Sequence, residues 1–538
     1  MGDSDKWRDN MKKKVISVLA AGTMAAVVLT GCSSSSSTSS SGGSSAKASK
    51  ASNTSSEAET ATGAQAASGE VSIDFDEDPY EVAIQFVGLN ESNNDLPAVE
   101  DALNEILKQK VNATVDIQPL FIGDMGTTTS MGIAGGEKLD IVCVGLTYSM
   151  STAVSDGVLL PLDDLIAERG PAVAKVTENV SAAQKVSGQT YAITGYPYAA
   201  MSGGFAYNKT MADKYGIDMH DGMTLDELTD VGATLKENGV YLTSLSNSSQ
   251  LNAKLMNSWD VYGASGDYGV IKDAANSTTI ENIYASDEIR DYFKHTKTWF
   301  DNGYLPQDQM TDTTSVQQHF ANQKVFGTAT AYSPDQVAVW TNPSFETGIV
   351  KLSDPILETA GVGEQMWGIA ATCERPDKAM DVLNVIYSDP EVQNLIQYGI
   401  EGQDYVRVDG TQNVITYTGS ASNEDHSGYF TSFCHFGDPF TRYVVAPLTD
   451  EYTAELKTFN DEAATAKSFG YQFDASEYSA EAAAISSVFT AELPQLNGGQ
   501  VEDVDAAVDQ LVADLQDAGI DTVIAGNQEQ LDAYLANQ

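Results

Sequence analysis

"LDIVCVG", residues 139–145, is the stretch that decides the fold class. Apart from Asp140 the run is apolar throughout, which predicts a strand buried on both faces. Such strands are typical of parallel sheets, where helices cover both faces. Cys143 lies inside the run, and we expect it to be a small core residue.

The segments before this strand predict an α/β lobe. Residues 80–88, "YEVAIQFVG", alternate in polarity and predict a first strand. Residues 94–110 predict a helix, with Pro97 near its start and apolar side chains along one face. A second strand at 113–120 and a short helix within 124–138 follow. The order strand–helix–strand–helix–strand is typical of an α/β unit.

Helical patterns dominate the rest of the chain. Thr224 and Glu227 form a capping box at the start of a helix. Residues 286–305 predict an amphipathic helix that places Trp299 in the core. Further predicted segments are a strand at 324–332 and helices at 377–405, 501–519 and 527–538.

Composition narrows the class of partner. Without its first 70 residues the chain keeps about 470, enough for two or three domains. The net charge of −47 argues against a nucleic-acid partner, because phosphate binding needs clustered Lys and Arg. The same charge disfavours docking on anionic lipid heads and a large anionic ligand, and it keeps a surface protein soluble.

The first 70 residues predict export and a tether. Residues 12–14 are lysines, and 15–30 form an apolar run that is short for a membrane span. This pattern predicts a secretory signal, with Met1 and Met11 both open as the start. Cys32 closes the run, and its surroundings resemble the bacterial lipobox, which implies lipidation of that cysteine after cleavage at its N-terminal side. An ordinary signal peptide with an incidental cysteine is the alternative.

Residues 33–70 are rich in Ser, Ala and Gly and have too little apolar content to fold. We expect them to be a disordered tether that spans on the order of 35 Å. Attached at Cys32, the tether would hold a folded body at the extracellular face of the cell membrane. Two acyl chains on one diacylglycerol group suffice for stable anchoring.

The search for catalytic and metal-binding motifs is negative. There is no G-x-S-x-G, H-E-x-x-H or Walker loop. The cysteines beyond the lipobox, Cys143, Cys373 and Cys434, are odd in number and widely spaced, which predicts neither a disulfide framework nor a zinc site. Asp74, Asp76 and Asp78 have a calcium-like spacing but lack the Gly and Glu of an EF-hand, so we expect a solvated acidic lead-in. We therefore expect no cofactor and no metal.

Several segments, in order, carry a family resemblance. They are "NDLPAVEDALNEIL" (94–107), "GGEKLDIVCVG" (135–145), "DGVLLPLDDLI" (156–166), "GGFAYNKTMADKYGID" (203–218), "YSDPEVQNLIQYGIEGQDYV" (387–406), "SFGYQFDASEYSAEAAAI" (468–485) and "GIDTVIAGNQEQLDAYLANQ" (519–538). Their order resembles that of the large lipid-anchored solute-binding proteins of ABC importers. The match is to the carbohydrate-type group of Gram-positive gut and soil bacteria, in its long subgroup with a C-terminal domain of unknown function.

The resemblance implies a two-lobed α/β Venus-flytrap fold with a helical C-terminal segment. The implied divisions are a signal at 1–32, the tether at 33–70, lobes at 71–205 and 206–345, and a region at 346–538 shared between the lobes. It also implies a monomer that closes on an oligosaccharide by hinge motion and delivers it to a membrane permease. ATP hydrolysis would then lie in another subunit, so the resemblance implies that this chain is not an enzyme.

Sugar chemistry selects the candidate ligand contacts. Aromatic rings cover apolar sugar faces, and polar side chains satisfy the hydroxyls. The candidates lie in predicted loops: Tyr148, Tyr196, Tyr198, Trp259, Trp340, Trp367, Asp438 and Arg442. For Trp259 and Trp367 a core position is equally open. A peptide ligand on the same fold and a surface glycan hydrolase are the alternative functions.

Overall fold

A mixed five-stranded sheet forms the centre of the first lobe. The computed structural model describes residues 71–89, 94–245, 251–419, 428–431 and 435–538. The sheet order is β2-β1-β3-β13-β6, made of β1 Tyr80–Gly88, β2 Ala113–Phe121, β3 Ile141–Gly145, β6 Ala192–Thr194 and β13 Gln365–Ile369. The predicted strands β1 to β3 are confirmed and run parallel. Strand β13 runs antiparallel to both of its neighbours, β3 and β6. As predicted, every residue of β3 is buried.

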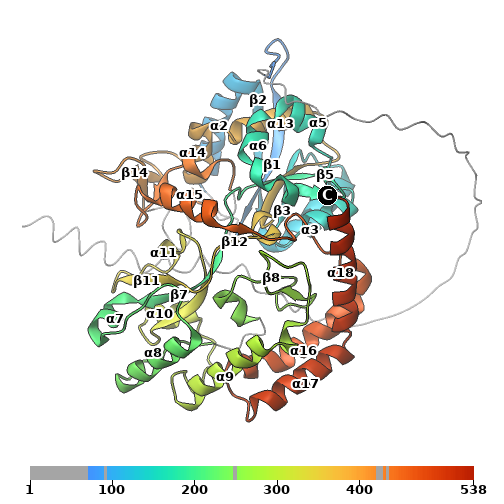
Figure 1. Cartoon of the computed structure of the whole chain (residues 1–538). Coiled ribbons are helices and arrows are strands. Elements are labelled where there is room, and N and C mark those ends of the chain that lie inside the picture. The colour runs from blue at the N-terminus through green and yellow to red at the C-terminus, as the bar shows by residue number, and fades with distance from the viewer. Residues whose placement is uncertain (1–70, 90–93, 246–250, 420–427, 432–434) are drawn as a thin grey trace, which may run out of the picture.

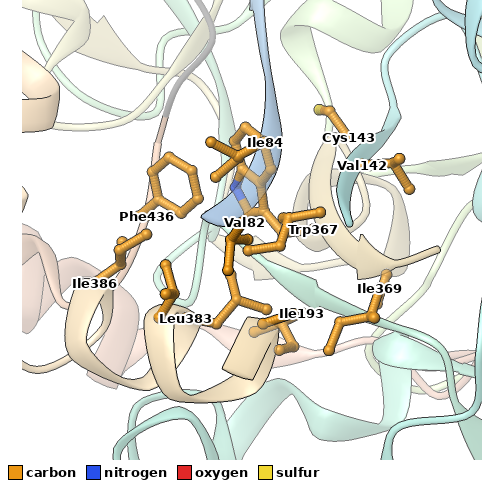
Figure 2. Close-up of a cluster of buried hydrophobic side chains, with 14 of the residues drawn as sticks. Val82, Ile84, Val142, Cys143, Ile193, Trp367, Ile369, Leu383, Ile386 and Phe436 are labelled. Atoms are coloured by element: carbon orange, nitrogen blue, oxygen red, sulfur yellow. The ribbon is translucent and has the colours of Figure 1, made fainter. Parts of the chain in front are cut away.

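Helices from two distant parts of the chain cover this sheet (Figure 1). Those that follow the first strands are α2 Leu96–Val111, α3 Met125–Gly135, α4 Met150–Ser155, α5 Asp163–Arg169 and α6 Pro171–Val176. Those that arrive with β13 are α13 Pro376–Ile386 and α14 Pro390–Tyr398. Figure 2 shows the shared core, in which Cys143 and Trp367 lie with Ile386 of α13. The core position predicted for Cys143 is confirmed, since its side chain is fully buried.

The second lobe is built on a smaller antiparallel sheet. Its central strand is β7 Ser202–Asn208, flanked by β10 Gly327–Tyr332 and β11 Thr347–Lys351. The predicted boundaries at 205 and 345 therefore need correction, because β7 lies wholly in this lobe and β11 belongs to it as well. Its helices are α7 Lys209–Tyr215, α8 Leu225–Glu237, α9 Asp287–Asp301, α10 Val316–Ala321 and α11 Gln336–Val339.

Helices from the end of the chain complete the second lobe. They are α16 Ser479–Asn497, α17 Val504–Asp517 and α18 Ile520–Ala536. Ile289 and Phe293 of α9 share one buried cluster with Phe489 of α16 and Val508 of α17. Trp299 is buried in a neighbouring cluster, which confirms its predicted core position. The predicted capping box between Thr224 and Glu227 is also present.

Three segments run side by side where the chain passes between the lobes. Met201 and Ile356 exchange backbone hydrogen bonds of 2.9 and 2.8 Å. Strand β12 (Ile356–Leu357) pairs in parallel with β17 (Ala464–Thr465). Helix α15 (Tyr452–Glu462) lies beside them, and its Asn460 side chain accepts a hydrogen bond from the amide of Ala200. We call these three segments, 199–202, 353–358 and 463–466, the hinge.

Short strands, one short helix and several 3₁₀ turns complete the described part of the two lobes. The remaining strands are β4 Lys185–Val186, β5 Gln189–Thr190, β8 Asp260–Val261, β9 Val270–Ile271, β14 Tyr405–Arg407, β15 Val414–Tyr417 and β16 Val444–Val445. Within the described ranges the remaining helix is α12 Thr359–Val362, and the 3₁₀ turns used below are η3 Glu178–Gln184, η4 Asn252–Met256 and η5 Ile283–Ala285. Among the described residues, no helix combines the length and apolar character that a membrane crossing needs.

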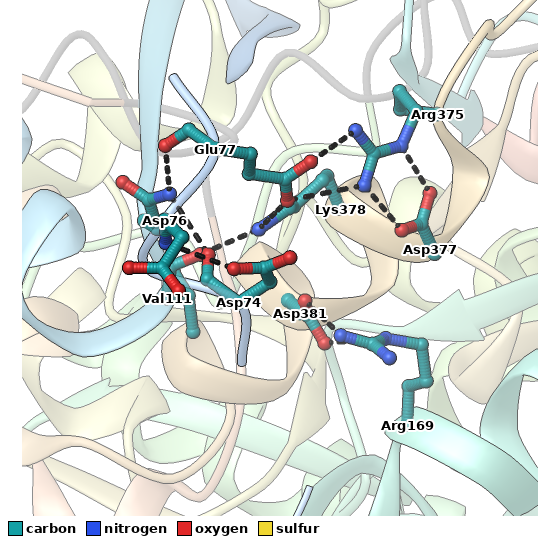
Figure 3. Close-up of polar contacts among 10 residues, drawn as sticks. Asp74, Asp76, Glu77, Val111, Arg169, Arg375, Asp377, Lys378 and Asp381 are labelled. Atoms are coloured by element: carbon teal, nitrogen blue, oxygen red, sulfur yellow. Dashed lines mark hydrogen bonds and ion pairs between the residues drawn. The ribbon is translucent and has the colours of Figure 1, made fainter. Parts of the chain in front are cut away.

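The acidic lead-in is fixed to the first lobe by ion pairs (Figure 3). Glu77 pairs with Arg375 at 3.0 Å and with the buried Lys378 at 2.8 Å. Hydrogen bonds from Arg375 and then Lys378 lower the pKa of Glu77 to about 2. Asn112 adds side-chain bonds to the carbonyls of Asp74 and Glu77. Asp74, Asp76 and Asp78 are exposed, as expected for a solvated lead-in, whereas two cations at the start of α13 hold the carboxylate of Glu77 between them.

Candidate functional site

Charged and aromatic side chains from both lobes lie within electrostatic range of one another. Asp335 belongs to the turn between β10 and α11 of the second lobe, and Glu364 directly precedes β13 of the first lobe. Burial and the charge of Asp335 raise the pKa of Glu364. Burial raises the pKa of Tyr196, which lies within the electrostatic reach of Glu364, Arg442 and Asp335. We call Tyr196, Asp335, Glu364, Arg442 and Tyr452 the interlobe site.

The end of β3 holds Glu364 in place. The carbonyl of Glu364 accepts a 2.6 Å hydrogen bond from the amide of Leu146, which directly follows β3. Gly145 approaches so closely that a Cβ atom there would lie 2.4 Å from the same carbonyl oxygen, and its φ is +94°. Only glycine meets both conditions. The carboxyl ends of parallel strands are where open α/β sheets place their ligand contacts.

Helix α15 brings aromatic rings to the interlobe site. Tyr332, at the end of β10, packs against Phe459 of α15 with ring centroids 5.6 Å apart. Burial and the charge of Asp335 raise the pKa of Tyr452, whereas the positive charge of Arg442 opposes that shift. The interlobe site thus combines carboxylates, a guanidinium and aromatic rings from elements that belong to different lobes.

A pocket in the second lobe adjoins this site. Its volume is about 330 Å³, and it lies against edge strand β10. Its wall contains Trp340 and is otherwise mostly small or polar: Ser244, Leu245, Asn252, Leu255, Val316, Gln317, Thr328, Ala329, Thr330, Ala331 and Gln336. Because Gln336 directly follows Asp335, the pocket and the interlobe site are neighbours.

The Trp340 side chain in this wall is fixed by a hydrogen bond and by ring packing. Its Nε1 donates a hydrogen bond to Thr330 Oγ1 at 3.3 Å, and its ring packs edge-on against Phe320 with ring centroids 5.6 Å apart. Only 4% of the residue is exposed. Trp340 therefore lies almost entirely within a buried apolar cluster with Phe320 and Phe345, and only a small part of its surface faces the pocket, beside amide and hydroxyl groups.

Two of the predicted ligand contacts lie in the core instead. Trp367 is fully buried in β13, where its ring stacks on Phe436 at 4.0 Å and its Nε1 donates to the carbonyl of His435 at 2.8 Å. Tyr148 is 5% exposed, and its hydroxyl donates to Asp156 at 2.8 Å. Burial raises the pKa of Tyr148 to about 12. Both predictions are corrected, because strands and helices of the first lobe enclose these rings.

Four of the predicted residues lie in one neighbourhood, and a fifth lies elsewhere. Tyr196 packs against His435 with ring centroids 4.8 Å apart, and Tyr198 packs against Phe440 at 4.4 Å. Asp438 accepts a 2.9 Å bond from the amide of Phe440. In the same loop, Arg442 donates to Gln397 at 3.2 Å. Trp259 is half-buried and packs against the cluster of α9 and the C-terminal helices.

Sequence reasoning missed Asp335, Glu364 and Tyr452. Glu364 lies three residues before Trp367 and carries a usable signal, namely an acidic residue directly before an apolar strand. Asp335 and Tyr452 carry no comparable signal in so acidic a chain. Their importance depends on which segments face one another across the lobes.

A second charged group lies beside the hinge. Burial, and then the charge of Asp260, raise the pKa of Glu358 well above its usual range. Burial lowers the pKa of Lys254. Asp260 also accepts a hydrogen bond from Tyr262 at 3.1 Å. No three His, Cys, Asp or Glu side chains in the described part of the chain are grouped so that they could hold a metal ion.

Comparisons with known proteins agree with this architecture. Residues 467–536 match a domain of unknown function (DUF3502). A Streptococcus pneumoniae protein described as a carbohydrate ABC transporter substrate-binding protein is 25% identical over 441 residues, which cover 81% of this chain and 87% of that protein.

Solved structures show the same fold. The crystal structure of the N-glycan transport solute binding protein NgtS from Streptococcus pneumoniae superposes with a TM-score of 0.72 at 23% identity, covering 85% of this chain and 99% of that one. An HMO-binding, ABC-transporter-associated solute binding protein from Bifidobacterium longum infantis gives a TM-score of 0.62 at 16% identity, covering 85% and 100%. Residues 101–401, more than half of the chain, match the bacterial extracellular solute-binding proteins, and this protein therefore belongs to that family.

Proposed function

We propose that this protein is the substrate-binding subunit of an ABC importer and captures an oligosaccharide between its lobes for delivery to a membrane permease. The observation that carries the proposal is the pocket with Trp340 in its wall, next to an interlobe site with side chains from both lobes. The pocket combines a small aromatic surface with hydroxyl and amide groups and lies next to carboxylates, which suits a sugar because sugars present C–H faces and rings of hydroxyls.

The relatives support a carbohydrate ligand. Structures of NgtS contain Man1GlcNAc and Man5GlcNAc, and the Bifidobacterium protein is described as HMO binding. We therefore choose Man5GlcNAc as the first probe for this chain. Of the predicted contacts, Trp340, Tyr196, Tyr198, Asp438 and Arg442 stay in the proposal, and Gln336, Asp335, Glu364 and Tyr452 join them.

Binding closes the lobes about the hinge in this proposal. Three structures of NgtS superpose on this chain with TM-scores of 0.72, 0.64 and 0.59. The TM-scores differ because the three NgtS structures differ in shape from one another. This difference supports lobe movement in this fold. A ligand that contacts both lobes shifts the equilibrium toward the closed form. Small-angle scattering should show a smaller radius of gyration with saturating Man5GlcNAc, and an unchanged radius would contradict closure.

Calorimetric titration separates the candidate ligands. We expect saturable binding of an oligosaccharide and none of peptides or amino acids; the reverse result would establish the peptide alternative. A thermal-shift screen is the companion test, since a ligand at 100 times its Kd stabilises the fold by about 2.7 kcal/mol. Release of new reducing ends from the glycan during incubation would contradict a pure binding role and indicate a hydrolase.

The proposed location is the extracellular face of the cell membrane, with the chain anchored through lipidated Cys32. Residues 1–70, which carry the signal, Cys32 and the tether, lie outside the described residues. The proposal rests on the lipobox-like sequence and on the extracellular family. We expect Cys32→Ser to release the mature protein from membranes or to leave an uncut precursor. A variant that is processed and retained like the parent would contradict lipidation at this residue.

A further inference from the structure

Residues 464–473 connect the hinge to the C-terminal helices and touch the first lobe on the way. Phe469 is half-buried against a small cluster that includes Val180 and Ala183 of η3 and Val362 of α12. Turn η3 leads directly into the β4–β5 hairpin and strand β6 of the first lobe. Phe469 is therefore an apolar contact between the C-terminal region and the first lobe.

Polar contacts reinforce this attachment. The amide of Gly470 donates to Thr359 Oγ1 at 2.8 Å. The side chain of Gln472 donates to the carbonyl of Ala183 at 3.4 Å. Gly470 has a φ of +89°, and a Cβ atom there would lie closest to the Tyr534 hydroxyl of α18 and 2.9 Å from the Cβ of Ala182 in the first lobe. The backbone at 470 therefore lies between α18 and the first lobe, and there is no room for a side chain between the two.

The same segment is firmly attached to the second lobe. The amide of Lys467 donates to the carbonyl of Ala274 at 2.8 Å. Tyr471 donates through its hydroxyl to Asn527 of α18, with Oδ1 at 2.7 Å, and the hydroxyl of Tyr534 donates to the carbonyl of Phe469 at 3.0 Å. Figure 1 shows α18, in red, running from the level of α16 and α17 along one side of the molecule toward the first lobe.

The C-terminal helices cannot move independently of the second lobe. Their buried side chains share one core with α9, and Gln528 of α18 accepts a 2.8 Å bond from the amide of Ile280. A segment that is fixed to one lobe and presses on the other restricts the angle between them. Neither of the other two hinge segments continues into a domain of this kind.

We propose that the domain at 467–536 is a strut that sets how far the two lobes can open. Its helices complete the core of the second lobe, and its first residues, Phe469 to Gln472, bear on η3 and α12 of the first lobe. Losing the Phe469 contact frees the lobes to rotate further apart. This role rests on the lobe movement proposed above and adds a function for the C-terminal domain.

The test compares two aromatic residues of this one segment. Phe469 contacts the first lobe, whereas the rings that Phe473 meets, Tyr268 at 5.3 Å and Tyr478 at 5.8 Å, belong to the second-lobe side. Dyes on bio-orthogonal residues at the exposed positions Glu168 and Glu237 report the interlobe distance in the full chain without ligand. We expect Phe469→Ala to broaden the distance distribution toward larger values and Phe473→Ala to leave it like the parent.

Two outcomes would overturn the strut. One is an unchanged distribution in Phe469→Ala, and the other is equal broadening by Phe473→Ala. If Phe469→Ala does not fold, Thr359→Val provides the same measurement, because it removes only the acceptor of the Gly470 amide while keeping the shape of the side chain. A distribution like the parent's in Thr359→Val would then count against the strut. Since no ligand is present, a protein that binds no glycan can still show the strut, and the two proposals fail separately.

Discussion

The two lobes reach a closed core by different routes. The first lobe takes three neighbouring strands from residues 80–145 and completes its five-stranded sheet with β6 and with β13, which follows the strands of the second lobe in the sequence. The second lobe has a three-stranded sheet, and much of its core lies between α9 and helices that begin at residue 479. The first lobe is thus held by strand pairing, whereas the second depends on helices from the far end of the chain.

The same contrast decides what an aromatic residue does. Trp367 lies on β13, which has a partner strand on each side, so its ring is enclosed by the first lobe. Trp340 lies next to β10, an edge strand, and its ring contributes to a pocket. A central strand buries its side chains, whereas the edge of a sheet leaves space for a ligand.

The largest expected effect comes from removing residues 467–538. This truncation uncovers the buried face of α9, including Ile289 and Phe293. We expect α9 amides to lose their protection from hydrogen exchange, because a helix without its apolar partner is marginal in water. Removing only residues 537–538, beyond α18, is the control. If α9 stayed protected in the long truncation, the second lobe would not depend on the C-terminal helices.

Trp367→Ala tests the first lobe. Emptying a fully buried Trp site costs about 3–5 kcal/mol of unfolding free energy. Urea denaturation measures that loss, and calorimetry on the folded fraction should show glycan affinity close to that of the parent. Lost affinity with little destabilisation would return Trp367 to the ligand site.

Gln336→Ala tests the pocket of the second lobe. Gln336 is half-buried in the pocket wall, and losing one neutral hydrogen bond costs about 0.5–1.5 kcal/mol. We expect Man5GlcNAc affinity to fall up to about tenfold, with stability unchanged. Gln318→Ala, on the exposed side of α10, is the matched control. Equal affinities for the two variants would exclude Gln336 from ligand contact.

The smallest expected effect concerns pH and the C-terminal helices. Burial and a hydrogen bond with Asp514 raise the pKa of Glu492 from 4.5 to about 7. Because the folded state favours the protonated form, this contribution to stability is fully present below pH 4.5 and is lost as the pH rises through 7. Glu492→Gln should flatten that part of the stability profile. Identical profiles for the parent and Glu492→Gln would contradict the assignment.

Local sequence patterns predicted the elements of the first lobe well. Strands β1, β2 and β3 and helices α2 and α3 follow the predicted segments closely, as do the helix with Trp299 and the capping box at Thr224. These features depend on periodicity, capping residues and glycine, which act between residues only a few positions apart. The resemblance carried by segment order led to the family, which the match over residues 101–401 confirmed.

The sequence by itself determined the type of most elements, the acidic charge and the family. Only the tertiary structure decided which aromatic residues are core and which face a pocket, that Glu77 is clamped, and that Asp335 and Glu364 lie near each other. The physical reason is that burial depends on a strand's neighbours. Trp367 of β13 is paired with Cys143 of β3 on one side and with Ile193 of β6 on the other. Both partners are more than 170 positions away in the sequence, and no local pattern encodes that pairing.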